Sequence, residues 1–162
     1  MKTSITTINL LYQLAKNPEK QEKLRKEIFN LLPRKDSPMS RNSLNNIPYM
    51  RAALKEGYRI APVIVGNSRA VGCDLVIKGY QIPKGTDCLM VNSLVQLDDK
   101  YIPRSKEFIP ERWIKHRSNI DNIKYQSSKQ TNPFVYLPFG FGSRTCIGRR
   151  FAEMETQILM IR

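Results

Sequence analysis

The segment Phe139-Gly140-Phe141-Gly142-Ser143-Arg144-Thr145-Cys146-Ile147-Gly148 carries more chemical information than any other part of the sequence. Cys146 stands directly before a stretch with helical spacing, and the N-terminus of a helix stabilises an anion such as a thiolate. Gly142 and Gly148 leave room for a large planar group to approach the backbone. Arg144 offers a guanidinium to a carboxylate. The alternative interpretation is a buried cysteine in a glycine-rich turn.

Apolar residues at helical spacing precede this segment at the start of the chain. One helix is expected over residues 5–15, where the apolar stripe consists of Ile5, Ile8, Leu11, Tyr12 and Ala15. Asn17 and Pro18 predict the cap and first position of a second helix, over residues 18–31. Its buried side is predicted to consist of Leu24, Ile28 and Leu31. A third helix is expected from Pro48 to Arg59, before Ala61-Pro62.

The middle of the chain has a different character. Short β-type runs occupy residues 63–65, 75–77 and 88–91, with glycines and Pro83 between them. Residues 98–135 are polar and contain three prolines, and so long an irregular stretch is usually functional. A last helix is expected over about 147–162, and one face of it carries Phe151, Met154, Ile158 and Ile161. This order predicts an α+β fold that is mainly α.

Composition limits the classes of protein to consider. The chain has 162 residues, enough for about one domain, and 41% of them are hydrophobic, enough for a core. Lys and Arg number 27 against 14 Asp and Glu, a net charge of +13. The basic residues are spread along the chain without a nucleic-acid-binding motif, so no nucleic-acid partner is expected. The charge indicates either a solvated basic surface or an acidic protein partner.

The cysteine segment resembles the ligand loop of the cytochrome P-450 superfamily of haem-thiolate monooxygenases, F-x-x-G-x-R-x-C-x-G. The fixed positions are matched by Phe139, Gly142, Arg144, Cys146 and Gly148. The resemblance implies that Cys146 is the axial ligand of the iron of haem b. It also implies that the other four residues contact the haem, with Arg144 beside a propionate. The full enzyme would insert one oxygen atom from O2 into a small organic substrate.

Two further motifs resemble the same family and occur in the same order. Glu56-Gly57-Tyr58-Arg59 resembles the E-x-x-R motif of the family's K helix, and residues 108–113 resemble its P-E-R-F/W segment. The resemblance implies a buried triad of Glu56, Arg59 and Arg112. Two guanidinium groups around one carboxylate would lock a long loop onto a helix, which is a structural role.

Other positions carry over by alignment alone. Residues 17–21 look like the start of the family's J helix. Arg69 resembles the arginine that contacts a haem propionate. Residues at which family members line the substrate pocket are Val63, Ile64, Val65 and Gly66. For these apolar residues, a place in the ordinary core is the alternative.

The resemblance covers only the C-terminal portion of the family's fold. That portion holds the end of the I helix, the J, K and L helices, a small β-sheet, the irregular meander and the cysteine loop. We therefore expect residues 1–162 to form a single incomplete domain and a truncated product or gene model. The family's acid–alcohol pair for oxygen activation aligns with Met1 and Lys2, which cannot serve, so this chain alone is expected to be inactive. Any membrane association would involve parts outside this chain.

Basic residues point to one branch of the family. Arg51 and Lys55 lie one turn apart on the expected K helix, where mitochondrial members dock an acidic ferredoxin. The run Gly148-Arg149-Arg150-Phe151 also resembles mitochondrial members. Together with residues 134–143 and 79–87, it is most similar to the mitochondrial members of insects. We therefore expect a ferredoxin-type electron donor and a place on the matrix side of the mitochondrial inner membrane. One alternative is a member of the endoplasmic reticulum membrane with a flavoprotein reductase; another is a non-catalytic basic binding module that keeps the scaffold without haem.

Overall fold

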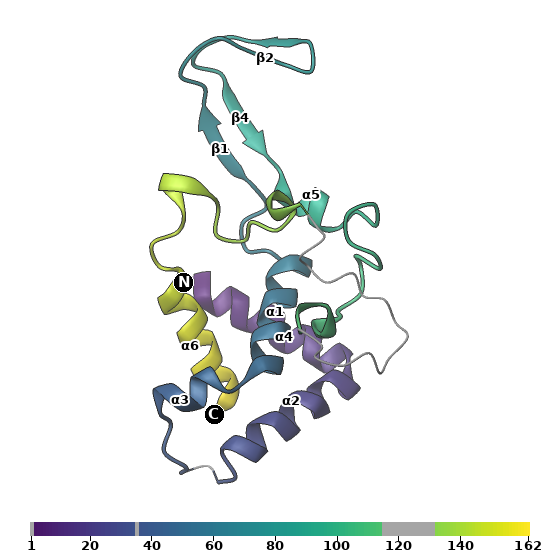
Figure 1. Ribbon diagram of the computed structural model, residues 1–162, viewed down its shortest axis with the longest axis vertical. Coiled ribbons are helices and arrows are strands. Elements are labelled where there is room, and N and C mark those ends of the chain that lie inside the picture. The colour runs from purple at the N-terminus through teal and green to yellow at the C-terminus, as the bar shows by residue number, and fades with distance from the viewer. Residues whose placement is uncertain (1, 35, 115–131) are drawn as a thin grey trace.

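The computed structural model describes residues 2–34, 36–114 and 132–162. Helices dominate it, and short antiparallel strands project from one end of the helical part (Figure 1). The α-helices are α1 (Lys2–Lys16), α2 (Pro18–Leu31), α3 (Arg41–Asn45), α4 (Pro48–Ile60), α5 (Asn92–Gln96) and α6 (Arg149–Ile161). The strands are β1 (Asn67–Ala70), β2 (Leu75–Ile77), β3 (Tyr80–Ile82) and β4 (Asp87–Met90). Single turns of 3-10 helix are η1 (Pro110–Trp113), η2 (Pro133–Val135) and η3 (Gly142–Arg144).

Helix α4 forms the centre of the molecule, in contact with α1, α2, α5, α6 and η1 (Figure 1). The prediction of a helix from Pro48 to Arg59 is confirmed, and α4 extends one residue further. Its hydrophobic residues join side chains of α1 and α2 in the core, which includes Leu10, Leu14, Leu24, Ile47, Met50, Ala53 and Leu54. Because α4 is covered from several sides, it can also bury charged side chains that would otherwise be solvated.

The first predicted helix is present as α1, but its predicted apolar face is not the buried one. Ile8 and Tyr12 are 63% and 59% exposed, whereas Leu10 and Leu14 are almost fully buried. Leu10 packs against Gly57 of α4, where an added Cβ would lie 3.4 Å from Leu10 Cδ1. Apolar residues lie on two sides of this helix, and its packing partners decide which side is buried.

Helix α2 has the predicted bounds and buries Leu24, while Ile28 and Leu31 are partly buried. Asn17 is at the cap position, but its side chain makes no capping hydrogen bond. Its Nδ2 instead donates to the carbonyl oxygen of Gln13, at 2.7 Å. Because α1 ends only one residue earlier, a free carbonyl of its last turn is in closer reach than the amides of α2.

The predicted strand at residues 63–65 is wrong, and β1 lies just beyond it. Polar residues of β1 pair with β4 in antiparallel register, from Asn67 opposite Met90 to Ala70 opposite Asp87. A strand requires a partner for its backbone hydrogen bonds, and β4 aligns with 67–70. The run at 75–77 is confirmed as β2, and β3, which the sequence analysis missed, pairs with it. Lys78 and Gly79 have positive φ in the turn between them.

The irregular stretch after residue 98 contains η1, and its residues 115–131 lie outside the described part of the chain. The last helix begins at Arg149, two residues later than predicted. Its predicted apolar face is only half covered, since Phe151 is 65% exposed while Ile161 packs on the core. Across residues 2–34, 36–114 and 132–162, none of the helices is both long and apolar enough to cross a bilayer.

Candidate functional site

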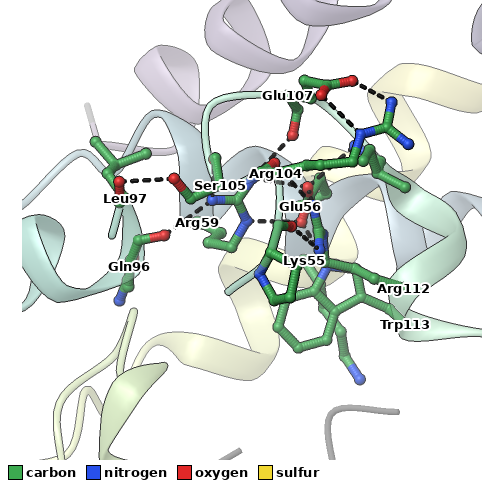
Figure 2. Close-up of polar contacts among 12 residues, drawn as sticks. Lys55, Glu56, Arg59, Gln96, Leu97, Arg104, Ser105, Glu107, Arg112 and Trp113 are labelled. Atoms are coloured by element: carbon green, nitrogen blue, oxygen red, sulfur yellow. Dashed lines mark hydrogen bonds and ion pairs between the residues drawn. The ribbon is translucent and has the colours of Figure 1, made fainter. Parts of the chain in front are cut away.

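A buried carboxylate on α4, that of Glu56, organises the irregular segment after β4. Both Glu56 and Arg59 are fully buried. Arg59 Nε donates to Glu56 Oε2 at 2.9 Å, and Arg59 Nη2 donates to Glu56 Oε1 at 2.8 Å. The other guanidinium N–H groups reach the backbone carbonyl oxygens of Gln96, at the end of α5, and of Ser105 and Glu107 in the irregular segment (Figure 2). All five donors of this guanidinium are thereby used.

Arg112 of η1 approaches the same carboxylate from the other side. Its Nε donates to Glu56 Oε1 at 2.9 Å (Figure 2). Its two terminal nitrogens donate to the carbonyl oxygens of Pro103 and Arg104. The structure therefore brings Glu56, Arg59 and Arg112 together, and it ties five backbone carbonyls of residues 96–107 to two arginines. Removing one member of such a buried group leaves an uncompensated charge, which typically costs about 3–5 kcal/mol.

Two further donors to Glu56 were not identified from the sequence. The Ile109 backbone N–H donates to Oε1 at 3.0 Å, and Trp113 Nε1 donates to Oε2 at 2.7 Å. A backbone donor leaves no signal in side-chain patterns. Trp113 lies within the motif that was recognised, but a tryptophan there is equally compatible with simple packing. Only the placement of η1 against α4 shows which atom its indole contacts.

A second carboxylate, that of Glu111, joins η1 to α2 and α4. Its Oε1 accepts hydrogen bonds from Lys23 Nζ at 2.8 Å, Lys20 Nζ at 3.2 Å and the Tyr49 hydroxyl at 3.2 Å. Burial raises the pKa of Glu111, but the bonds from Lys23 and Lys20 outweigh burial and hold this pKa below its ordinary value of 4.5. Burial and the nearby Glu111 charge raise the pKa of Tyr49, which keeps its proton and donates.

The segment around Cys146 forms a tight loop before α6. Gly140 and Gly142 have φ of +77° and +71°, which favour glycine. The Cys146 backbone N–H donates to the Phe139 carbonyl oxygen at 2.9 Å and closes the loop. The Cys146 thiol is exposed, and a Cβ added at Gly148 would lie 3.9 Å from its sulfur. The loop thus presents the thiol to solvent close to the first turn of α6.

Cys146 lines a cavity of about 440 Å³. Residues of the cysteine loop that line it are Phe139, Gly140, Arg144, Cys146 and Gly148. Its other walls come from α1, α6, α5 and the segment before β1, and include Thr3, Thr6, Phe151, Gln96, Val63, Ile64 and Gly66. A cavity of this size, mostly apolar with a few polar groups, is typical of a small-molecule or cofactor site.

Most of the residues that the sequence analysis assigned to the haem or substrate line this cavity, but three do not. Gly142 and Val65 are not among its lining residues. Arg69 lies on β1 with an exposed side chain, and its Nη1 donates to the carbonyl oxygen of the adjacent Ser68 at 2.7 Å. Gly66 lines the cavity. Its position also requires a glycine, since an added Cβ would lie 2.4 Å from the Met90 carbonyl oxygen.

The two basic residues expected to dock a partner have different surroundings. Arg51 Nη2 donates to the carbonyl oxygens of Leu44 and Asn45, at 2.9 and 2.5 Å, and thereby caps the end of α3. Lys55 is exposed, and its Nζ lies 5.9 Å from the centroid of the Trp113 ring. The Arg51 guanidinium therefore has an internal role that spacing along a helix does not reveal.

Comparison with known proteins identifies the class to which this fold and loop belong. The family model described as "Cytochrome P450" matches residues 1–162, and the chain belongs to this family. It is 51% identical over 160 residues to "Cytochrome P450 CYP12A2" of Musca domestica, covering 96% of this chain and 29% of that protein. It is 48% identical over 160 residues to "Probable cytochrome P450 12b2, mitochondrial" of Drosophila melanogaster, covering 99% of this chain and 30% of the relative.

A third relative is "Probable cytochrome P450 12c1, mitochondrial" of Drosophila melanogaster, 46% identical over 156 residues, with 96% of this chain and 30% of the relative covered. The likeness to insect mitochondrial members of the family is therefore confirmed. The chain spans about 30% of the length of these curated relatives.

The cavity can be tested against the haem that this family implies. A thiolate-ligated haem needs a cysteine for its iron, an apolar surround for its ring and cations for its carboxylates. The cavity supplies an exposed thiol from Cys146, the guanidinium of Arg144 and an apolar lining that includes Phe139. Gly148 keeps the space beside the sulfur free of a side chain. The residues present fit the group.

Proposed function

We propose that this chain is the haem-thiolate portion of a monooxygenase, with Cys146 as the axial ligand of a haem iron. The observation that supports this most directly is the exposed Cys146 thiol at a largely apolar cavity that Arg144 also lines. Cys73 is also a free, exposed cysteine, but it does not line this cavity. When bound, a thiolate-ligated haem supplies the activation of O2 that inserts one oxygen atom into an organic substrate.

Each residue at the cavity has a role that its chemistry supports. Arg144 would pair with a haem propionate through a charge-assisted hydrogen bond. Phe139 and Gly148 would adjoin the macrocycle, and Gly142 would shape the loop through its positive φ. Val63 and Ile64, which line the same cavity, would contact an apolar substrate.

Within the family's fold, we assign α1 to the end of the I helix and α2, α4 and α6 to the J, K and L helices. The cluster of Glu56, Arg59 and Arg112 then has a structural role, because these side chains are buried and their hydrogen bonds join α4 to η1 and to the irregular segment. Arg69 remains a candidate propionate partner only if its side chain turns away from Ser68. The acid–alcohol pair aligns with Met1, which lies outside the described residues, and with Lys2, which begins α1.

We further propose that the electron donor is an acidic ferredoxin in the mitochondrion. Relatives that are 48% and 46% identical carry the word mitochondrial in their names. The net charge of +13 attracts an acidic partner over long distances, and Lys55 is exposed on α4. A flavoprotein reductase of the endoplasmic reticulum is the alternative donor, and the two are distinguished by which one supports turnover.

The test of the haem proposal uses a chimaera in which this chain replaces the matching segment of the Musca domestica relative. The unmodified chimaera should bind haem and show thiolate-type absorption after reduction and treatment with carbon monoxide. Cys146→Ser should abolish that absorption, because a neutral hydroxyl is a poor substitute for a thiolate. Cys73→Ser and Cys88→Ser are the matched controls and should leave it unchanged.

Two results would count against the proposal. If Cys146→Ser kept the thiolate-type absorption while a control variant lost it, the ligand would be another cysteine. If the folded chimaera bound no haem, the interpretation as a non-catalytic basic module would be favoured.

A further inference from the structure

Trp113 makes the one neutral side-chain contact to the buried Glu56 carboxylate among the hydrogen bonds described above. Its Nε1 donates to Glu56 Oε2 at 2.7 Å, whereas the other donor to that oxygen is Arg59 Nε at 2.9 Å. Arg112 and the Ile109 N–H both bond to Oε1. The indole N–H therefore fixes the orientation of the Trp113 ring through a bond to a charged acceptor, which is stronger than a neutral hydrogen bond.

The Trp113 ring in turn contacts the segment that leads to the cysteine loop. Its centroid lies 4.6 Å from that of Tyr136, with an angle of 45° between the two rings. The Tyr136 hydroxyl donates to the Lys55 carbonyl oxygen at 3.1 Å, and Lys55 Nζ lies over the Trp113 ring. Figure 2 shows Trp113 beside the buried Glu56. Tyr136 is thus held between a ring from η1 and the backbone of α4.

Between Tyr136 and Cys146, the chain makes a further contact with α4 through Phe139. Phe139 packs edge-on against Tyr58 of α4, with ring centroids 5.0 Å apart. The carbonyl oxygen of Phe139 accepts the hydrogen bond from the Cys146 backbone N–H. The loop that carries Cys146 is therefore attached to α4 at two neighbouring points, through Tyr136 and through Phe139.

We propose that Trp113 is a positioning residue for the thiol of Cys146. It acts through Tyr136, whose ring it holds against α4 while the indole N–H is anchored on Glu56. If Trp113 only filled space, its replacement by phenylalanine would weaken local packing. A change at the Tyr136 hydroxyl, which leaves the Trp113 ring in place, would then have no effect on the thiol. This inference rests on the proposed function of Cys146 as a haem ligand. The role of Trp113 is to keep the Cys146 thiolate in place as that ligand.

The experiment measures how fast the haem-loaded chimaera loses thiolate-type absorption at raised temperature, with haem content recorded in parallel. Trp113→Phe keeps a ring beside Tyr136 and removes the N–H. Tyr136→Phe removes the hydroxyl that bonds to α4 and leaves the glutamate contacts in place. The control is Tyr101→Leu, because Tyr101 is an exposed aromatic residue that also has a lysine over its ring, with Lys100 Nζ at 5.6 Å.

Trp113→Phe should keep its haem content and lose the thiolate signal about tenfold faster, as expected for a lost hydrogen bond to a charged group. Tyr136→Phe should show a smaller acceleration, and Tyr101→Leu should show none. Equal rates for unmodified protein, Trp113→Phe and Tyr136→Phe would overturn the proposal. If Trp113→Phe takes up no haem, Tyr136→Phe decides: faster loss supports the proposal, and an unchanged rate overturns it. A complete absence of thiolate-type absorption in the unmodified chimaera would instead refute the proposed function itself.

Discussion

The Glu56 carboxylate is the centre of the hydrogen-bond cluster that joins α4 to η1. It is fully buried, and it accepts hydrogen bonds from two arginines, one indole and one backbone amide. Those arginines also donate to five backbone carbonyl oxygens between residues 96 and 107. A segment with little regular structure thereby follows a defined path, because its backbone acceptors are satisfied by side chains instead of by a helix or a sheet.

Replacing Glu56 by Gln should destabilise this chain strongly. The amide leaves Arg59 and Arg112 close together without a counter-charge, and breaking a buried ion pair typically costs about 3–5 kcal/mol. Urea denaturation followed by circular dichroism measures the change in the free energy of unfolding. In the chimaera, haem incorporation should fall in parallel.

The control for this substitution is Glu22→Gln, which removes an exposed carboxylate 3.6 Å from Arg25 on the surface of α2. Surface pairs of this kind contribute about 0–1 kcal/mol. If both variants shifted the unfolding free energy equally, the buried cluster would not have the structural role proposed for it.

At the scale of elements, Glu111 connects η1 to α2. Its pKa lies below 4.5, so the folded state favours the charged carboxylate. The contribution of Glu111 to stability is therefore present at neutral pH. It is lost as the pH falls from about 4.5 through the lower pKa of the folded state, because the folded form then has to take up a proton against its lysines.

Glu111→Gln should lower the free energy of unfolding by about 1 kcal/mol at pH 7, the usual net value of a hydrogen bond to a partly exposed charged group. The difference between the variant and the unmodified chain should shrink between pH 5 and pH 3. Urea denaturation over that range measures it. Asp36→Asn, which alters an exposed pair with Arg34, is the control. A difference that stays constant down to pH 3 would contradict the assigned pKa direction.

The chain as a whole carries a net charge of +13 over its 162 residues, which acts at longer range than any single contact. The Arg51 guanidinium donates hydrogen bonds to carbonyl oxygens at the end of α3. Reversing its charge would therefore disturb that helix as well as any docking surface. Lys55 provides the cleaner probe of an acidic electron donor. Its charge acts over a distance that salt shortens, with a Debye length of about 10 Å at 0.1 M.

Lys55→Glu in the chimaera should reduce ferredoxin-supported turnover at low salt by about tenfold, because charges at the rim of an interface mainly change the association rate. Haem content and the absorption spectrum should be unchanged. Turnover of the unmodified protein should decrease as ionic strength rises.

Lys26→Glu changes the net charge equally at an exposed position of α2 and should have a much smaller effect. Equal losses for Lys55→Glu and Lys26→Glu would mean that only net charge matters. Reduction by a flavoprotein reductase alone would refute the mitochondrial donor.

Local patterns in the sequence were sufficient to predict the positions of α1, α2, α4 and α6, of β2 and, to within one residue, of β4, and to indicate the family. They missed β3 and placed the first strand before β1. Each correct prediction depends on signals within a few residues, such as Pro18 at a helix start or the glycines around Cys146. The grouping of Glu56 with Arg59 and Arg112 followed only from the family resemblance, since two distant segments have to meet. Their contacts in the structure agree with it.

Only the tertiary structure decided which face of a helix is buried and which residues of an extended segment pair as a strand. Leu10, rather than Ile8, is buried in α1 because Gly57 of α4 receives it. Strand β1 begins at Asn67 because β4 aligns there, although residues 63–65 are more apolar. Trp113 bonds to Glu56 only because η1 lies against α4. Periodicity shows that a helix or strand can form, but burial and pairing depend on partners that are distant in the sequence and close only in the folded chain.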